Sequence, residues 1–428
     1  MNILWITNIV FPEALALLNN GDTLKGSGGW MIGAAEALLR FNDNISLSVA
    51  TVSREVSDLT RLEGEKITYW LLPYGKGNHR INHDYEPLWR RVRDEVMPDV
   101  IHLHGSEFSH GLAYIDACGT DHVCVSIQGL VSAISSYYCA GLTRNEIRSS
   151  ITLGTLYFGG ITRGLREYKN RGACELAILR KVKHVIGRTS WDKARTIAIN
   201  PSVEYHYCGE ILRPGFYTGK KWRYEECVPH SIFLSQAVNP FKGLHMVLRA
   251  MPLVLRHYPD AQIRIAGRNF TDSSTLKKRL LLTDYGKLIC KLISCNGLEG
   301  KVTFTGQLDE EGMQREYLHS NVFVCPSAIE NSPNSLGEAQ LLGVPVMASY
   351  VGGIPDMMKG DEDHLYRFEE VDMLAQKIVE LFDKKGDLSM EPMRQEALRR
   401  HDPGANTREL IDIYNIVNSA IPRISDKR

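Results

Sequence analysis

Near its C-terminal end the chain reads Cys325-Pro-Ser-Ala-Ile-Glu330-Asn-Ser-Pro-Asn-Ser-Leu-Gly-Glu338-Ala-Gln-Leu-Leu-Gly343-Val-Pro345. Ser332 and Pro333 predict a helix start, because serine caps helix N-termini and proline is tolerated at the first helical position. Gly343 predicts the helix end. An apolar run at 322–325 precedes this helix and is typical of a buried strand. The segment is therefore one strand–loop–helix unit of a parallel α/β sheet.

Two glutamates, Glu330 and Glu338, flank the predicted helix start at positions eight apart. Glu330 lies in the loop after the strand, and Glu338 lies inside the helix. Between them, the free N–H groups of the helix N-terminus favour a bound phosphate. A carboxylate on each side of an anion site matches the ribose, diphosphate and hexose of a nucleotide sugar. We therefore expect a nucleotide-sugar site here.

The length and composition indicate a two-domain globular protein. A chain of 428 residues is too long for one ordinary core. Its apolar content of 43% is ordinary, and its formal net charge of zero argues against a nucleic-acid partner held by bulk charge. We expect a first domain at 1–212, a turn-rich linker at 213–230, a second domain at 231–402 and a C-terminal helical segment at 403–428.

Short apolar runs alternate with helical patterns in both halves of the chain. Such runs predict parallel sheets covered on both faces. The strands are expected at 2–7, 45–52, 67–72, 100–104, 123–127, 184–186, 231–235, 262–266, 301–305, 322–325, 344–348 and 364–368. The helices are expected at 29–41, 244–257, 275–293, 310–319, 334–342, 373–382, 391–400 and 407–417. Ligands of such sheets bind beyond the carboxyl ends of the strands.

Cysteine usage indicates a reduced, cytoplasmic protein. The chain has nine cysteines, and none of them forms a C-x-x-C pair. No histidine cluster accompanies them, so the sequence predicts no metal site. The apolar N-terminal run is too short to span a membrane, and it lacks the basic start of a signal peptide.

Basic residues are concentrated at 144–195, where twelve Lys and Arg accompany only four Asp and Glu. Two interpretations stay open. The stretch is either a solvated helical face or a surface that contacts an anionic partner, such as a membrane or an acidic acceptor.

Three further motifs follow predicted strands. Gly28 and Gly29 open the first helix and permit a close approach of backbone N–H groups to an anion. Lys242 precedes Gly243 at a strand-to-helix junction, where an ammonium group can reach a diphosphate. His104 ends a strand and is expected in the ligand cleft, whereas His102, on the same face, is expected to be packed or hydrogen-bonded.

Taken together, these motifs resemble the family 4 retaining glycosyltransferases of the GT-B fold, in a branch found in bacterial polysaccharide clusters. The resemblance covers nearly the whole chain. It is carried by the segments 231–243, 330–345, 352–356, 99–107, 126–129 and 187–192. It implies two Rossmann-like domains that face each other across a cleft, with a last helix that returns to the first domain.

The resemblance also implies an activity and a set of site residues. The activity is transfer of a hexose from a UDP- or GDP-linked donor to an acceptor hydroxyl, with retention and without a metal or other cofactor. The acceptor would be a glycan or a lipid-linked molecule. The basic stretch at 144–195 suggests a lipid-linked acceptor and a peripheral membrane contact at the inner face. The catalytic residues would be Glu330 and Lys242. The donor would be bound by Glu338, Ser332, Asn334, Ser335, Leu336, Gly28, Gly29, Gly306, Gln307, Leu308, Arg268 and Gln236, and the acceptor side of the cleft would include His104, Glu107 and Gln128.

The chain departs from the family at two positions. Gln236 stands where the family has an arginine, so Arg268 is the candidate for the missing diphosphate cation. Gln128 stands where the family often has a histidine, and a neutral amide cannot act as a general base. Two alternatives therefore stay open: a non-catalytic scaffold that binds a nucleotide sugar, and a GT-B-fold sugar-nucleotide epimerase.

Overall fold

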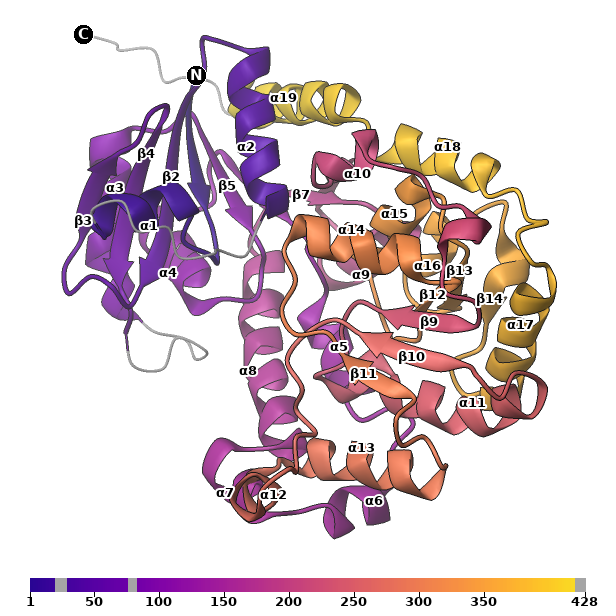
Figure 1. Ribbon diagram of the computed structural model, residues 1–428. Coiled ribbons are helices and arrows are strands. Elements are labelled where there is room, and N and C mark those ends of the chain that lie inside the picture. The colour runs from indigo at the N-terminus through magenta and orange to yellow at the C-terminus, as the bar shows by residue number, and fades with distance from the viewer. Residues whose placement is uncertain (20–28, 76–82, 420–428) are drawn as a thin grey trace, which may run out of the picture. The chain divides into compact units, whose positions relative to one another are not determined.

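A computed structural model describes residues 1–19, 29–75 and 83–419 (Figure 1). The chain divides into two compact units. Unit 1 comprises Met1–Ser132, Lys169–Leu212 and His401–Arg428, and unit 2 comprises Ala133–Tyr168 and Arg213–Arg400. The boundary near residue 169 falls within helix α8 (Ile161–Leu179). Residues 133–168, expected in the first domain, thus pack with unit 2.

Unit 1 is built on an eight-stranded sheet in the order β3-β4-β2-β1-β5-β6-β7-β8. All neighbouring strands are parallel except β3 and β4, which are antiparallel. The strands are β1 (Asn2–Ile6), β2 (Ser46–Ser53), β3 (Thr60–Glu63), β4 (Ile67–Pro73), β5 (Val100–His104), β6 (Val123–Ser126), β7 (His184–Gly187) and β8 (Glu204–Tyr207). The strand order reverses between β1 and β5, which is where ligands of such sheets bind.

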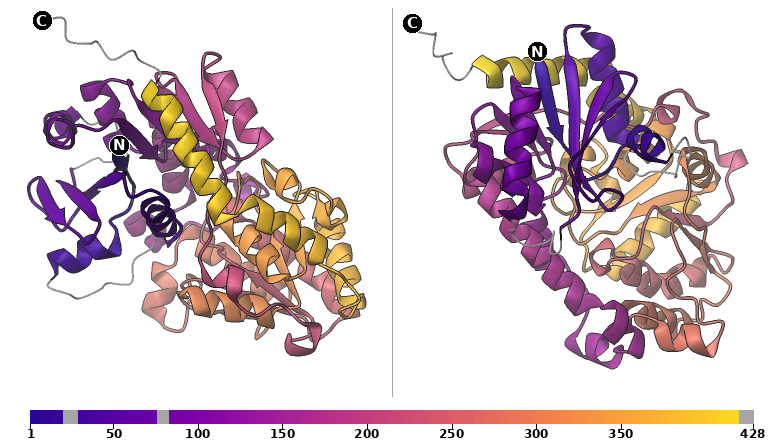
Figure 2. Two further views of the ribbon diagram at one scale, coloured as in Figure 1. Left: turned by 90° about the horizontal axis from the view of Figure 1, so that it is seen from above. Right: turned by 90° about the vertical axis from the view of Figure 1, so that its left-hand side faces the viewer.

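The helices of unit 1 include the last helix of the chain. They are α1 (Pro12–Leu18), α2 (Gly29–Phe41), η1 (His83–Tyr85), α3 (Glu86–Val96), α4 (Ser109–Cys118), the C-terminal part of α8, α9 (Ser190–Ile199) and α19 (Pro403–Ser419). Helix α19, yellow in Figures 1 and 2, lies alongside α2. The Tyr414 hydroxyl accepts from Trp5 Nε1 at 2.9 Å and lies 2.7 Å from His102 Nδ1. This confirms the predicted return of the last helix to the first domain.

Unit 2 contains an entirely parallel, six-stranded sheet in the order β11-β10-β9-β12-β13-β14. The strands are β9 (Ser231–Leu234), β10 (Gln262–Ile265), β11 (Val302–Phe304), β12 (Val322–Cys325), β13 (Val346–Ser349) and β14 (Leu365–Tyr366). Every residue of β9 and β12 is buried, as expected for central strands covered on both faces. The order reverses between these two strands, so β9 and β12 mark the expected ligand position.

The helices of unit 2 come from both of its chain segments. They are most of α5 (Val131–Tyr137), α6 (Arg144–Ser149), α7 (Leu153–Phe158), the start of α8, α10 (Gly215–Thr218), η2 (Tyr224–Glu226), η3 (Pro240–Lys242), α11 (Leu244–His257), α12 (Leu276–Leu281), α13 (Asp284–Cys295), α14 (Glu310–His319), α15 (Asn334–Leu342), α16 (Ile354–Met357), η4 (Glu362–His364), α17 (Val371–Asp383) and α18 (Glu391–Arg400). No helix in the described part of the chain is long and apolar enough to cross a membrane.

Two local predictions were wrong. The helix expected at 275–293 is split into α12 and α13, because Thr283 caps a new helix by accepting from Gly286 N. Ser332 is not the cap of α15: Pro333 holds that position in extended conformation, without a side-chain cap hydrogen bond. The predicted end is confirmed, since Gly343 closes α15 with a φ of 75°.

Candidate functional site

The carboxyl ends of four strands place the predicted donor residues along one edge of the unit 2 sheet. Gln236 follows β9, Arg268 follows β10, Gly306 follows β11 and Glu330 follows β12. Gly267 N donates to Gly306 O at 2.8 Å and ties two of these loops together. Gln236, Arg268 and Gln307 are exposed, and Leu308 is partly buried.

Glu330 and Lys242, the two predicted catalytic residues, form an ion pair. Lys242 Nζ lies 2.5 Å from Glu330 Oε1, and the two side chains are only 14% and 13% exposed. Ser327 Oγ donates to the same carboxylate oxygen at 2.8 Å. Burial alone would lower the pKa of Lys242, but the adjacent Glu330 carboxylate raises it, so the amine is charged at neutral pH. The pair joins the loops after the two switch-point strands.

Two glycines allow these loops to approach so closely. Gly243 follows Lys242 with a φ of 77°, and a Cβ there would lie 1.8 Å from Pro326 O. Gly352 has a φ of 53°, and its Cβ would lie 1.9 Å from Glu330 O. Any side chain at either position would displace the loop that carries Glu330. Both glycines belong to the sequence motifs that carry the family resemblance. The close contacts explain why these two positions require glycine.

Glu338 is held by a residue that the sequence did not single out. Arg213 donates from Nε and from an Nη atom to the two Glu338 oxygens, at 2.7 and 2.8 Å. Burial raises the pKa of Glu338, and the guanidinium opposes that rise. Arg213 opens the stretch expected to be a linker, which instead packs with unit 2. The two residues are 125 positions apart, so no local pattern relates them.

The N-terminus of α15 lies between the two glutamates in the sequence, as predicted. Its first amides have no acceptor within a helix. The Leu336 and Gly337 amides are exceptions, because both donate to Pro333 O, at 3.0 and 3.4 Å. Asn334 Oδ1 is buried and has no hydrogen-bond partner in the described structure. Ser332 is buried, and Ser335 O accepts from the Tyr317 hydroxyl at 2.9 Å.

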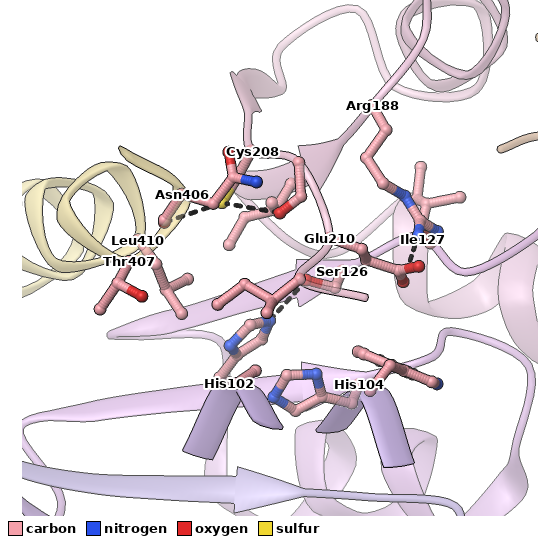
Figure 3. A pocket seen from close by; sticks show the side chains of 15 residues that line it. His102, His104, Ser126, Ile127, Arg188, Cys208, Glu210, Asn406, Thr407 and Leu410 are labelled. Carbon is pink, nitrogen blue, oxygen red and sulfur yellow. Dashed lines mark hydrogen bonds and ion pairs between the residues drawn. The ribbon is translucent and has the colours of Figure 1, made fainter. Parts of the chain in front are cut away.

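In unit 1, His102 and His104 share one face of β5 and line a cavity of about 60 Å³ (Figure 3). His102 is hydrogen-bonded on both nitrogens, to Tyr414 and to Ser126, which confirms the prediction for it. His104 is 4% exposed, and neither of its nitrogens has a hydrogen-bond partner among the described residues. Burial lowers the pKa of His104 to about 3, so its ring is neutral at neutral pH.

Glu107 and Gln128, also predicted, lie close to the turn at Gly105. A Cβ on Gly105 would be 3.0 Å from Glu107 Oε2 and 3.7 Å from Gln128 Oε1. Arg171 donates to Glu107 Oε1 at 2.9 Å, whereas Glu107 Oε2 has no described partner. Gln128 Nε2 is likewise buried without a described partner. The carboxyl ends of β5 and β6 therefore carry free hydrogen-bonding capacity.

The sequence did not predict three charged residues that lie near the carboxyl ends of β5 and β6. Arg188 and Glu210 form an ion pair on the wall of the cavity (Figure 3). Arg188 also donates to the backbone oxygen of Gln128 at 3.1 Å. Glu175 accepts from the amides of Val131 and Ser132 at 2.8 and 2.9 Å, and it is fully buried. Burial raises the pKa of Glu175 to about 7.

The predicted glycine motif is only partly described. Gly28 lies outside the described residues, and α2 begins at Gly29, as expected.

Comparison with solved structures identifies the fold of the whole chain. Sucrose-phosphate synthase from Thermosynechococcus elongatus superposes with a TM-score of 0.69 at 16% identity, covering 98% of this chain and 100% of that one. Anabaena HepE in complex with UDP superposes with a TM-score of 0.62 at 14% identity, covering 97% of this chain and 100% of HepE. The fold is GT-B, as predicted from the motifs.

Sequence comparison then relates part of the chain to a family. Residues 229–384 match the family model described as Glycosyl transferases group 1. A GDP-mannose-dependent monoacylated alpha-(1-6)-phosphatidylinositol monomannoside mannosyltransferase of Corynebacterium glutamicum is 28% identical over 188 residues, which are 42% of this chain and 43% of the relative. A phosphatidyl-myo-inositol mannosyltransferase of Mycobacterium leprae is 26% identical over 191 residues, 44% and 46% of the two chains.

These matches confirm the predicted resemblance to family 4-type glycosyltransferases. The sequence match nevertheless spans less than half the length of these two relatives.

Proposed function

We propose that this protein is a retaining hexosyltransferase of polysaccharide or glycan biosynthesis. It would move a hexose from a nucleoside-diphosphate sugar to an acceptor hydroxyl. The observation that carries this proposal is the buried Lys242–Glu330 ion pair beside the α15 N-terminus, with Glu338 further along that helix. Cations and helix amides in such an arrangement suit a departing diphosphate.

In this proposal, donor binding rearranges the two ion pairs. Lys242 would turn from Glu330 to the diphosphate, and Glu330 would accept a hydroxyl of the transferred sugar. Glu338 would exchange some of its bonds with Arg213 for the ribose hydroxyls. The loop at 306–308 would hold the base. Lys242 and the helix amides supply the positive charge, so the proposed reaction uses no metal.

Retention is proposed from the chemistry of the site residues. A retaining glycosidase places a nucleophilic carboxylate beside the reacting carbon. In the donor edge, Glu330 and Glu338 are both committed to cations in the described structure. We therefore favour front-side attack, in which the leaving diphosphate takes the proton of the acceptor hydroxyl.

His104, Glu107 and Gln128 would bind the acceptor. Their unpartnered atoms include hydrogen-bond donors and acceptors, which suit sugar hydroxyls. The mycobacterial and corynebacterial relatives are named for phosphatidylinositol-linked acceptors, which supports a lipid-linked acceptor here. The donor stays open between GDP, named for the first relative, and UDP, bound in the HepE structure.

The deciding experiment combines ligand binding with turnover. A thermal-shift panel of UDP, GDP and their hexose conjugates should reveal one stabilising nucleotide. The purified protein should then release that nucleotide from the sugar conjugate faster when a glycan or lipid-linked acceptor is added. Binding without any release would support the scaffold alternative. Conversion of the donor sugar without an acceptor would support the epimerase. Stabilisation by no nucleotide would overturn the proposal.

A further inference from the structure

Two helices of unit 2 turn their apolar side chains outward. A soluble helix normally buries its apolar stripe. Here the apolar side chains along α7, and the two leucines of α12 that are four positions apart, face solvent. The exposed fractions are 53% for Leu153, 75% for Leu156, 77% for Tyr157, 63% for Phe158, 75% for Leu276 and 47% for Leu280. We call these six residues the apolar patch.

The two helices form a single surface, although they are more than a hundred residues apart in the chain (Figure 1). Thr152 Oγ1, at the start of α7, donates to Leu282 O at the end of α12. Gly154 packs so closely that a Cβ there would lie 2.2 Å from Leu281 O. Lys287 Nζ also donates to Ser149 O at 2.9 Å. The apolar patch is therefore held in place by backbone contacts within unit 2.

Exposed cations lie on α12 itself and on α6, the helix that precedes α7. Lys277, Lys278 and Arg279 lie on α12 between its two exposed leucines, and Arg144 and Arg148 lie on the neighbouring α6. Lys278 is paired with Asp272, and the other four have no ion pair in the described structure. Apolar and aromatic side chains next to Lys and Arg fit the headgroup region of an anionic membrane.

We propose that the apolar patch docks unit 2 onto an anionic membrane surface. The apolar side chains of α7 and α12 would enter the headgroup region, and the cations of α12 and α6 would contact lipid phosphates. This inference deepens the proposed function by naming how a lipid-linked acceptor is reached. It also sharpens the prediction for residues 144–195. Five cations of that stretch, Arg163, Arg171, Lys181, Lys183 and Arg188, are instead paired with acids.

The test is co-sedimentation with vesicles of phosphatidylcholine, with and without phosphatidylglycerol, in the absence of any donor. Wild-type protein should bind the anionic vesicles and be released by salt. The variant L156D/Y157D should lower the bound-to-free ratio at least about tenfold, equivalent to about 1.4 kcal/mol. K277A/R279A should weaken binding only to the anionic vesicles. Met97→Asp, at an apolar residue of unit 1 that is 72% exposed, is the matched control and should bind as wild type.

Two outcomes would overturn the membrane proposal. One is equal binding of wild type and patch variants. The other is patch-dependent dimerisation, measured by analytical ultracentrifugation, without vesicle binding, because a second copy would then cover the patch. Donor turnover with a short soluble acceptor should be unchanged in the patch variants, so failure of this proposal is distinguishable from failure of the proposed enzyme activity.

A separate observation concerns the outer edge of the unit 1 sheet. His184 on β7 is in register with Glu204 on β8, and His206 lies two residues further along the same strand. Strand alternation therefore puts all three side chains on one face. His184 Nδ1 lies 3.1 Å from His206 Nε2 and 3.5 Å from Glu204 Oε2. One ligand atom from each of the three lies within 4.8 Å of the others.

These separations match the ligands of a tetrahedral divalent cation. With metal–ligand bonds of about 2.0–2.1 Å, neighbouring ligands in a tetrahedron lie about 3.3 Å apart. We infer that His184, Glu204 and His206 bind a divalent transition metal such as Zn²⁺, apart from the proposed donor site. The sequence predicted no metal site, because the strand that carries Glu204 and His206 was not expected. Exposed Glu204 and partly buried His206 leave the fourth position open to solvent.

Titration of tag-free protein with Co²⁺ tests this inference. One equivalent should give the visible absorption of a tetrahedral site without a thiolate charge-transfer band, which excludes the exposed Cys295 as the ligand. His206→Ala should weaken binding at least about tenfold. Glu204→Gln, at an exposed residue, should also weaken Co²⁺ binding. His83→Ala, at another histidine of unit 1, is the control. Unchanged affinity in both site variants would overturn the assignment.

Discussion

Buried polar side chains at the carboxyl ends of the strands have different partners in the two sheets. In unit 2, Glu330 and Glu338 each face a cation, Lys242 and Arg213. In unit 1, Glu107 and Glu210 are also paired with arginines, but Glu175 is fully buried among neutral donors, and His104 and Gln128 retain unpartnered atoms. Paired charges suit an anionic donor, because a ligand can exchange with one partner of each pair. Neutral, unsatisfied groups suit hydroxyls.

The largest expected effect breaks the charge pairing of unit 2. Lys242→Ala should lower kcat by about 10²–10³, because one cation would no longer face the departing diphosphate. Steady-state donor turnover measures this. The double variant K242M/E330Q removes both charges, so it should recover thermal stability but not activity. Lys384→Ala, at an exposed lysine of unit 2, is the control. Near-wild-type turnover by Lys242→Ala would show that the pair is structural only.

The second prediction tests Glu175, the buried carboxylate of unit 1 that accepts hydrogen bonds from neutral groups. Burial raises the pKa of Glu175 to about 7, from the value of 4.5 for a glutamate in water. The folded state therefore binds this proton more tightly than the unfolded chain. The free energy of unfolding should therefore fall by roughly 3 kcal/mol as the pH rises from 4.5 to about 7. Glu175→Gln should flatten this pH dependence.

Urea unfolding at pH 5 and pH 8 measures the effect of Glu175. Exposed Glu55 in the same unit supplies the control variant, Glu55→Gln, which should keep the wild-type pH dependence. If the free energy of unfolding of Glu175→Gln falls equally steeply with pH, the pH dependence belongs to another titratable group.

The third prediction concerns Glu338, whose proposed partner is the ribose. Glu338→Gln should weaken nucleotide binding about 10- to 100-fold, since a hydrogen bond to a charged group contributes about 1.5–3 kcal/mol. Isothermal titration calorimetry measures this affinity. Unit 2 offers a matched control in Glu316, which Arg264 also holds with two bonds of 2.7 Å. Glu316→Gln should leave nucleotide affinity unchanged, and equal losses in both variants would contradict the ribose assignment.

The smallest effect is expected at Gln128. Gln128→Ala should raise the acceptor KM by about five- to tenfold, the equivalent of about 1 kcal/mol, and leave the donor KM unchanged. Initial rates with each substrate varied in turn separate the two. Gln376→Ala, at an exposed glutamine of unit 2, should change neither value. A change in the donor KM alone would show that Gln128 does not bind the acceptor.

The sequence predicted some helices and strands correctly and missed others. Strands β5 and β12 and helices α11, α14, α15 and α18 begin and end where the sequence placed them, because apolar periodicity and turn residues mark both ends. Edge strands β3 and β8 were missed, since half-exposed strands such as Glu204–Tyr207 carry no apolar run. The short helices at 131–158 were missed for lack of any pattern.

The candidate site divides in the same way. Glu330, Glu338 and Lys242 belong to spaced motifs and could be predicted. Arg213 and Glu175 act through contacts with residues 125 and 43 or 44 positions away, so only the fold reveals them.

Helix α19 has a consequence for the order in which the protein matures. Its Tyr414 holds Trp5 and His102 in the core of unit 1, with Ile413 and Val417 in the same cluster. A ribosome must therefore synthesise all of unit 2, and then α19, before the packing of unit 1 is complete. We expect unit 1 to be the last part to become protease-resistant during synthesis, although its residues emerge first.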